Sequence, residues 1–444
     1  MLSLFRILIS ALICILSTTI LYAEETNSDV VSAHGVFVLN TLLFLIGGFL
    51  VMWMAAGFAM LEAGLVRSKN VTTQLTKNIA LFSIAAIAYY LVGYNLMYPG
   101  SLEEGSWWIS GYLGPILSIA ELQPVGLEGV EDPGGYSTGS DFFFQLMFCA
   151  TTASIVSGTI AERMKLWPFL IFTVLLTAFL YPIEASWQWG GGWLSELGFS
   201  DFAGSTLVHA AGASAALAGA IVLGPRIGKY KDDGSVNPMP GSNMPLATLG
   251  TFILWLGWFG FNGGSQLALG TIGDAADVSR IFTNTNTAAA GGALAALILT
   301  QIMYKKIDLT MVLNGALAGL VSITAEPLAP SIGGATIIGA IGGVIVVIAV
   351  PMLDKLKIDD VVGAISVHGI AGIWGTIAVV FSGGSIGAQI IGTVSICLFV
   401  FILSLVIWYI LDALIGIRVS EEDELTGLDT TELGMDAYPD FSKS

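Results

Sequence analysis

The sequence predicts an all-α polytopic membrane protein with eleven transmembrane helices, built as a five-plus-five inverted repeat followed by a final long helix. Three observations predict this class. The 444 residues are 55% hydrophobic and only 11% charged, with a mean hydropathy of +0.81. Eleven apolar runs approach the roughly 20 residues that a helix needs to cross a hydrocarbon core. Finally, the eight-residue spacing between Asp201 and His209 recurs between Asp360 and His368.

The expected spans share helical length and few charges. They are residues 36–60, 78–98, 141–160, 167–183, 203–223, 245–262, 281–303, 310–326, 332–351, 361–381 and 389–413. Small residues let membrane helices approach closely, and the chain has 54 glycines. The three cysteines, Cys14, Cys149 and Cys397, lie in apolar runs and indicate no disulfide framework.

Lys and Arg gather in alternate loops, which sets the expected orientation. The basic loops and the segment after the last span contain Arg67, Lys69, Lys77, Arg163, Lys165, Arg226, Lys229, Lys231, Lys305, Lys306, Lys355, Lys357 and Arg418. Arg280 is the exception. Because basic loops stay on the cytoplasmic side, we expect a plasma (inner) membrane protein with its N-terminus outside and its C-terminus in the cytoplasm.

The two ends of the chain have distinct compositions. Residues 1–23 contain Arg6, an apolar core and Ala23, which is typical of a cleaved signal peptide, with a retained first helix as the alternative. Residues 24–416 form the expected transmembrane domain. Residues 417–444 form a cytosolic tail with eight acids from position 418, and a disordered acidic tail is the alternative.

The net charge of −17 includes seven acids and no Lys or Arg in residues 99–141. It disfavours nucleic acid and anionic lipid as partners.

His209 and His368 are two of only three histidines in the chain. An ionisable group deep in a bilayer is a functional hypothesis by default. Eight helical residues rise about 12 Å, so two helices entering from opposite faces would both bring a histidine near the midplane, where inverted-repeat transporters bind their substrates. Two neutral imidazoles can hydrogen-bond and pass a proton between them.

Other interpretations of these residues stay open. The histidines can be two unrelated core residues, or metal or haem ligands, although no Cys or Glu accompanies them at ligand-like spacing; we therefore expect no cofactor. Asp201 fits a helix N-cap, a group that favours a cation at the pore mouth, or both. Asp360 fits a cap only. Glu62, near Arg67 and Lys69, fits a structural polar network.

Longer motifs carry a resemblance to a known family. Trp189-Gly-Gly-Gly-Trp193 is followed by Asp201-Phe-Ala-Gly-Ser205 and then His209. The other motifs are Met60-Leu-Glu-Ala-Gly-Leu-Val-Arg-Ser-Lys-Asn70, Trp258-Phe-Gly-Phe-Asn-Gly-Gly-Ser265 and Asp360-Val-Val-Gly-Ala-Ile-Ser-Val-His-Gly369. In this order, from about residue 33 to the tail, they resemble the signature of the ammonium transporter (Amt) family.

The resemblance implies a homotrimer with one conduction path through each eleven-helix subunit, and a transporter rather than an enzyme. It implies that Phe148 and Phe261 are stacked rings that close the outer side of the pore. It further implies that Trp189 and Ser265, with Phe148, form an outer recruitment site, and the place of Asp201 at the pore mouth makes it a fourth candidate for that site. His209 and His368 would be the twin histidines of the pore and its proton relay.

These roles agree with elementary chemistry. Aromatic faces attract an ammonium ion through cation–π interaction, and a Ser hydroxyl accepts one of its N–H bonds. An apolar pore opposes an intact cation. Ammonium, and by the same logic methylammonium, can avoid this cost by releasing a proton, whereas potassium cannot. The fate of that proton decides whether transport is electrogenic.

The resemblance also implies that the tail packs on the inner face, couples subunits and meets a PII-type signal protein. Here Glu432-Leu-Gly-Met-Asp436 departs from the usual His-Gly-Glu of the family. Three rival functions remain. They are an ammonium sensor, for which this tail leaves no room for a signalling domain, a haem-containing redox enzyme and a passive gas channel. The main hypothesis is an ammonium transporter that recruits NH4+ outside and conducts NH3 into the cytoplasm.

Overall fold

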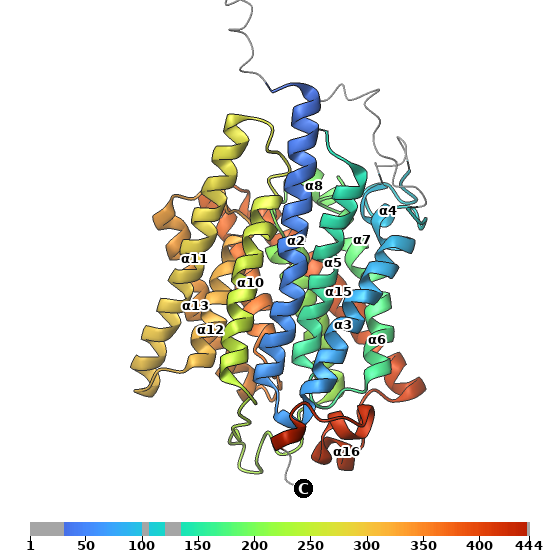
Figure 1. The fold of residues 1–444 in the computed structure, drawn as a ribbon, viewed down its shortest axis with the longest axis vertical. Coiled ribbons are helices and arrows are strands. Elements are labelled where there is room, and N and C mark those ends of the chain that lie inside the picture. The colour runs from blue at the N-terminus through green and yellow to red at the C-terminus, as the bar shows by residue number, and fades with distance from the viewer. Residues whose placement is uncertain (1–30, 100–105, 120–134, 442–444) are drawn as a thin grey trace, which may run out of the picture.

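The computed structural model describes residues 31–99, 106–119 and 135–441. Within these ranges the chain is almost entirely helical, and long helices run along one common direction to form a single bundle (Figure 1). Ten described helical segments are long and apolar enough to cross a membrane. An eleventh apolar helix, Leu309–Ile323, has 15 residues and is shorter. The all-helical membrane class is confirmed, while the count of eleven spans stays a prediction.

The segments of membrane-spanning length combine the elements labelled in Figure 1 with short tighter or wider turns. They are α2 (Ala33–Leu65); η2 (Ser68–Asn70), α3 (Val71–Ala88), η3 (Tyr89–Gly93) and α4 (Tyr94–Met97); α5 (Thr138–Thr159); α6 (Leu166–Leu175), η5 (Leu176–Leu180) and α7 (Tyr181–Ser186); η6 (Ser205–Ala210) and α9 (Ala211–Leu223); α10 (Met244–Gly264); α11 (Ile272–Tyr304); α13 (Ile332–Lys355); η7 (Ile365–Ile370), α14 (Ala371–Ala378) and η8 (Val379–Ser382); and α15 (Ile386–Ile415). The shorter elements are α8 (Trp193–Glu196), α12 (Leu309–Ile323), α16 (Glu421–Thr426), η9 (Asp429–Leu433) and η10 (Pro439–Phe441).

Helix α11 begins at Ile272, well before the predicted start at residue 281. A capping box explains the difference: the Thr271 side chain accepts from the Asp274 backbone N–H, and the Asp274 carboxylate accepts from the Thr271 backbone N–H. The extra turns contain Arg280, the one basic residue that broke the alternation. Hydropathy locates the membrane-embedded part of a helix, whereas the cap sets where the helix itself begins.

Glycines let α2 and α10 pack at backbone distance. A Cβ atom at Gly250 of α10 would lie 2.3 Å from the Leu61 backbone nitrogen of α2. A Cβ atom at Gly64 of α2 would lie 2.4 Å from the Ala247 nitrogen of α10. Any side chain at either position would push the helices apart, as expected for membrane helices that associate through small residues.

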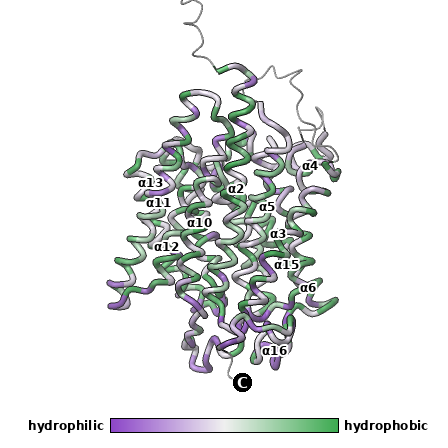
Figure 2. The backbone as a smooth tube through the Cα atoms, in the orientation of Figure 1, coloured by the Kyte–Doolittle hydropathy of each residue, from purple (hydrophilic) through white to green (hydrophobic). Residues whose placement is uncertain are grey.

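Hydrophobic residues cover the middle of the bundle, and hydrophilic residues gather near the end that carries α16 (Figure 2). We call this end the tail end. The basic residues of the predicted cytoplasmic loops meet there, since Arg67 pairs with Glu162, which follows α5, and Arg226, which follows α9, pairs with Asp359, which precedes η7. The structure therefore gathers loops that the sequence separates widely, as the alternation of basic residues predicted.

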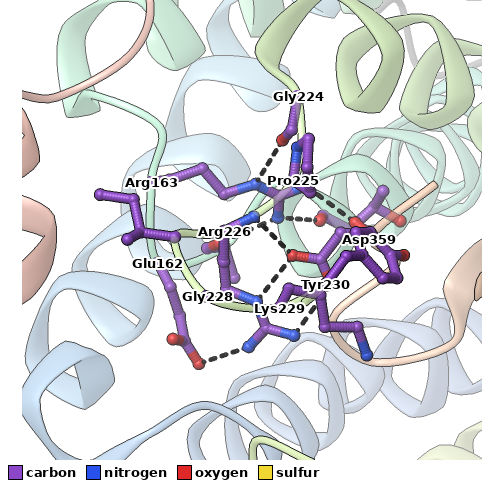
Figure 3. Close-up of polar contacts among 12 residues, drawn as sticks. Glu162, Arg163, Gly224, Pro225, Arg226, Gly228, Lys229, Tyr230 and Asp359 are labelled. Carbon is purple, nitrogen blue, oxygen red and sulfur yellow. Dashed lines mark hydrogen bonds and ion pairs between the residues drawn. The ribbon is translucent and has the colours of Figure 1, made fainter. Parts of the chain in front are cut away.

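A buried ionic cluster ties this end together (Figure 3). Arg226 extends between two carboxylates, with its Nη1 3.1 Å from Glu162 and its Nε 2.8 Å from Asp359. Arg163 donates to the backbone carbonyls of Gly224 and Asp359. Burial opposes the charge of Asp359, but Arg163 and Arg226 outweigh it and hold the pKa of that carboxyl below its ordinary range. Burial lowers the pKa of Arg163 to about 10, which still leaves its guanidinium charged at neutral pH.

Replacing Asp359 by Asn should destabilise the fold strongly, because Arg226 would remain buried with one partner fewer. Breaking a buried ion pair costs about 3–5 kcal/mol. Thermal unfolding in detergent measures the loss, with Asp354→Asn as control because its pair with Lys229 is partly exposed and worth about 0–1 kcal/mol. The pKa of Asp359 lies below the ordinary 3.8, so its contribution is complete above that pH and is lost only as the pH falls below it. Equal losses in the two variants would contradict this account.

The acidic tail packs against helix N-termini at this end. Asp429 accepts from the backbone N–H groups of Thr72 and Thr73 at the start of α3, at 2.9 and 2.7 Å. Glu432 accepts from Leu166 N–H at the start of α6, at 3.0 Å. Carboxylates are stabilised at the positive end of a helix dipole. The described tail is thus ordered by its acids, and the alternative of a disordered tail is wrong for residues up to 441.

Two sequence-based predictions concern residues that the structure does not describe. The signal peptide, residues 1–23, lies outside the described residues. So do the acids of the 99–141 segment apart from Asp141.

Candidate functional site

His209 and His368 meet inside the bundle. Their Nδ1 atoms lie 3.2 Å apart, and their ring centroids lie 5.1 Å apart with an interplanar angle of 24°. His209 has no exposed surface and His368 has 4%. The structure therefore brings together the two rings that the repeated spacing singled out.

The same local sequence builds both halves of this pair. Asp201 accepts four backbone N–H bonds, from Gly204, Ser205, Thr206 and Leu207, at 2.7–3.0 Å. Asp360 accepts from the N–H groups of Ala364 and Ile365 and from the Thr159 hydroxyl. Three residues after each Asp, a glycine takes a left-handed conformation, with φ of +103° at Gly204 and +82° at Gly363.

Each histidine then follows its glycine by five residues and sits in a six-residue π-helical turn, η6 or η7. The segments between Asp and His are therefore not the continuous α-helices assumed in placing the rings at mid-bilayer. In each segment, irregular backbone and then a wider π-helical turn take the place of a regular α-helix, so the rise per residue assumed for an α-helix does not apply. Wide turns of this kind occur frequently at functional sites.

The two segments run in opposite directions. The residue Arg226, just beyond the end of α9, pairs with Asp359, just before η7. At the other end, the Thr206 hydroxyl in η6 lies 2.6 Å from the Thr376 hydroxyl near the end of α14. One histidine is therefore reached from each end of the bundle, as the inverted repeat predicts.

Aromatic rings continue the histidine pair toward the end opposite the tail. His209 stacks on Phe261 with a centroid distance of 5.3 Å. Phe261 lies 4.1 Å from Phe148, and Trp189 meets Phe148 edge to face at 5.9 Å. Phe148 is 1% exposed and Phe261 is fully buried. These contacts form one unbroken row of rings from Trp189 to His368.

Polar groups flank this row at Trp189 and at Phe261. The Trp189 indole N–H donates to the Asp201 backbone carbonyl at 3.0 Å. The Ser265 hydroxyl, partly exposed, donates to the Phe261 carbonyl at 2.8 Å, which leaves its oxygen lone pairs free to accept. The carboxylate of Asp201 is fully buried and directed at backbone N–H groups. These bonds cap the start of η6, as predicted for Asp201, although the residue at the N-cap position itself is Gly204.

Toward the tail end, His368 lines a cavity of about 10 Å³, which approaches the lower limit for one water molecule. Phe58, Glu62 and Ser154 also line it. Asn314 and Val362 line both this cavity and a larger hollow of about 460 Å³ that includes Asp360 and Ser366. The histidine pair thus lies between an aromatic closure and a stepwise opening toward the tail end.

The sequence pattern of the Ammonium Transporter Family matches residues 42–438. The chain belongs to the ammonium transporter family. It is 39% identical over 472 aligned positions to an ammonium transporter of Archaeoglobus fulgidus, covering 98% of this chain and 96% of that protein. A solved structure described as a sensor Amt protein has a TM-score of 0.82 and 35% identity, covering 89% of this chain and 98% of that one. Mep2 of Candida albicans has a TM-score of 0.76 and 26% identity, covering 93% of each chain.

The family match spans residues 42–438, so every residue of this site lies within it. Two aromatic residues of this site were missed from the sequence. Trp258 stacks on His209 at 5.0 Å and donates its indole N–H to the Thr324 hydroxyl. It stands three residues before Phe261, so helical spacing within the quoted motif could have found it. Phe58, 6.1 Å from His368, had no comparable signal.

Glu62 lies in a buried polar network, as the sequence predicted, but its neighbours Arg67 and Lys69 are not its hydrogen-bond partners. Its carboxylate accepts from Gln74, Asn78 and Ser157, whereas Arg67 pairs with Glu162 instead. The two side chains point in different directions. The helical turn that carries Glu62 points it into the bundle, whereas the extended backbone at Val66 turns Arg67 toward the end of α5.

Proposed function

We propose that this protein transports ammonium across a plasma (inner) membrane into the cytoplasm. Family membership supports the substrate, and the name of the Archaeoglobus fulgidus relative agrees with it. In this proposal Trp189, Phe148 and Ser265 recruit NH4+ at the outer end, where ring faces attract the cation. The Ser265 oxygen accepts one N–H bond. Asp201 acts behind them by fixing the backbone that holds Trp189 and η6 in place.

Deprotonation follows at the stacked rings. Phe148 and Phe261 close the path with apolar surface, so an intact cation meets a large desolvation cost. Ammonium leaves its proton and continues as NH3, a route closed to potassium. This chemistry supplies selectivity between two cations of similar size.

The histidine pair is the proposed proton relay, and the 3.2 Å contact between the two Nδ1 atoms is the observation that carries the proposal. Two neutral imidazoles share such a contact when one Nδ1 donates to the other. The His209 Nε2 is buried and has no hydrogen-bond partner among the described residues, which suits an atom that accepts a proton from a ligand. Transfer across the Nδ1 contact would then carry the charge to His368 and the cavity beyond.

We also propose an orientation of the chain in the membrane. The N-terminus lies outside after removal of signal peptide 1–23, residues 24–416 form the membrane domain, and the tail 417–444 lies in the cytoplasm. The gathering of basic loops at the tail end supports this orientation. We further propose that the protein forms a homotrimer and that a PII-type signal protein binds at the tail end. Pull-down with a PII-type protein and native mass spectrometry test these two elements.

Ammonium-evoked current in liposomes tests the central function. Purified protein in potassium-loaded liposomes should give a transient inward current with ammonium or methylammonium and none with a potassium pulse. Liposomes without protein are the control. A current of equal size with potassium would overturn the selectivity mechanism. Ammonia permeation without any current would identify a passive gas channel.

Ammonium sensing is the second candidate, because one similar solved structure is described as a sensor Amt protein. A sensor should bind ammonium without sustained transport in the same liposomes. A haem enzyme would show a Soret band in the visible spectrum of the purified protein.

A further inference from the structure

Glu62 is a buried carboxyl group beside the proposed path that the transport scheme leaves unused. It lies on α2, is 1% exposed, and lines the same small cavity as His368. The five ion pairs formed among the described residues do not include it. A carboxylate in the membrane interior is expensive unless it has strong partners, so its position next to the cavity calls for an explanation.

Its hydrogen bonds suit an ionised carboxylate. Oε2 lies 2.6 Å from the amide nitrogens of both Gln74 and Asn78, which only donate. Oε1 lies 2.6 Å from the Ser157 hydroxyl oxygen. Three donors directed at one carboxyl favour its charged form.

The same contacts also suit a protonated carboxyl. The Ser157 oxygen lies 2.8 Å from the Ser154 carbonyl as well as 2.6 Å from Glu62 Oε1, but a hydroxyl has only one hydrogen. When Glu62 is charged, Ser157 donates to Oε1. When Oε1 is protonated, Glu62 donates to Ser157, and the Ser157 hydrogen turns to the Ser154 carbonyl. Both protonation states are therefore fully hydrogen-bonded without any movement of heavy atoms.

A purely structural acid would need only one of these states. The switchable Ser157 bond, the cavity shared with His368 and the absence of an ion pair among the described partners favour a group that exchanges protons. Lys77, fully buried on α3, donates to the Met164 carbonyl and is the nearby positive charge that offsets the charged form. The larger hollow begins at Asn314 and Val362, on the far side of the same cavity.

We propose that Glu62 receives the proton that leaves the histidine pair and returns it to ammonia. This inference rests on the proposed transport function. A proton passes from His368 to the Glu62 carboxylate through a single water molecule in the small cavity. Ammonia arriving there takes the proton from the Glu62 O–H bond, forms a fourth N–H bond and leaves as ammonium through the larger hollow. The carboxylate is regenerated, and one ammonium ion has crossed for each proton released outside.

The test replaces Glu62 by Gln, which keeps the shape and supplies an amide N–H to Ser157 but binds no proton. We expect the ammonium-evoked current to fall by a factor on the order of 100, the scale of a lost proton-transfer group. Ammonia permeation, followed by a pH-sensitive dye inside the liposomes, should persist. Glu184→Gln is the control, because Glu184 is also fully buried but lies on α7 and lines neither the small cavity nor the larger hollow; its current should match that of the wild type.

The role of Glu62 and the transport function can fail separately in this experiment. A wild-type protein without ammonium current would overturn the proposed function itself. A normal wild-type current with an equal current in Glu62→Gln would overturn only the role of Glu62. Infrared difference spectra of the full protein, recorded on adding ammonium, give an independent readout. A carboxyl signal should appear in the wild type, shift in Glu62→Asp and be absent in Glu62→Gln. A wild-type spectrum without this signal would also overturn the proposal. That readout does not require the Gln variant to fold.

Discussion

His209→Ala should abolish most of the ammonium-evoked current while leaving ammonia able to permeate. The substitution removes the ring that stacks on Phe261 and Trp258 and the Nδ1 that contacts His368. Without it, no titratable group among the described residues bridges the aromatic closure and the cavity, and proton relay through one imidazole contributes a factor on the order of 100–10,000. Current and dye-reported alkalinisation in the same liposomes measure the two fluxes separately.

Two further variants make this result interpretable. His209→Gln keeps a hydrogen-bonding side chain in η6 but cannot relay a proton, so it should lose current in the same way. His34→Ala removes the third histidine, which is exposed at the start of α2, and should transport as the wild type does. If His209→Ala kept its current and its selectivity over potassium, the relay would not pass through this ring.

Sequence patterns predicted the parts of this fold that depend on burial in lipid. Long apolar runs have few ways to satisfy their backbone in a bilayer, so hydropathy was enough to find the helices. Helix ends were less predictable, because they depend on individual capping bonds such as that of Thr271, which extends α11 beyond its apolar part. Helix α12 is an exception to the length criterion. It is buried in the bundle, but its 15 residues are fewer than a membrane-spanning helix is expected to have.

The site was predictable where one motif occurs twice. Asp201 and Asp360 each precede a left-handed glycine by three residues and a histidine by eight, and this repetition pointed to the meeting of the rings. The wide π-helical turns were not predictable, because they depend on how the carboxylate of each Asp gathers backbone N–H groups in three dimensions. The polar network of Glu62 was predicted but its members were not, since Ser157 lies 95 residues away along the chain.

Asp201→Ala should both destabilise the protein and stop transport. One carboxylate satisfies four buried backbone N–H groups at the start of η6, and an unsatisfied buried donor costs about 1–3 kcal/mol. Local relaxation will recover part of this loss, so we expect a decrease of about 3–5 kcal/mol in unfolding free energy. Because η6 carries His209, its loosening should also misplace the ring.

Thermal unfolding and ammonium current, measured on the same preparations, test both effects. Asp308→Ala is the matched control for stability alone: Asp308 caps α12 but is only partly buried, and losing such a cap costs about 1 kcal/mol. Asp201→Asn removes the charge but keeps one accepting oxygen, and with it two of the four N–H bonds. If Asp201→Asn folds and transports as the wild type does, the negative charge has no part in recruiting the cation. If it folds normally but loses current, the charge acts on the ion, and the role of Asp201 extends beyond that of a cap.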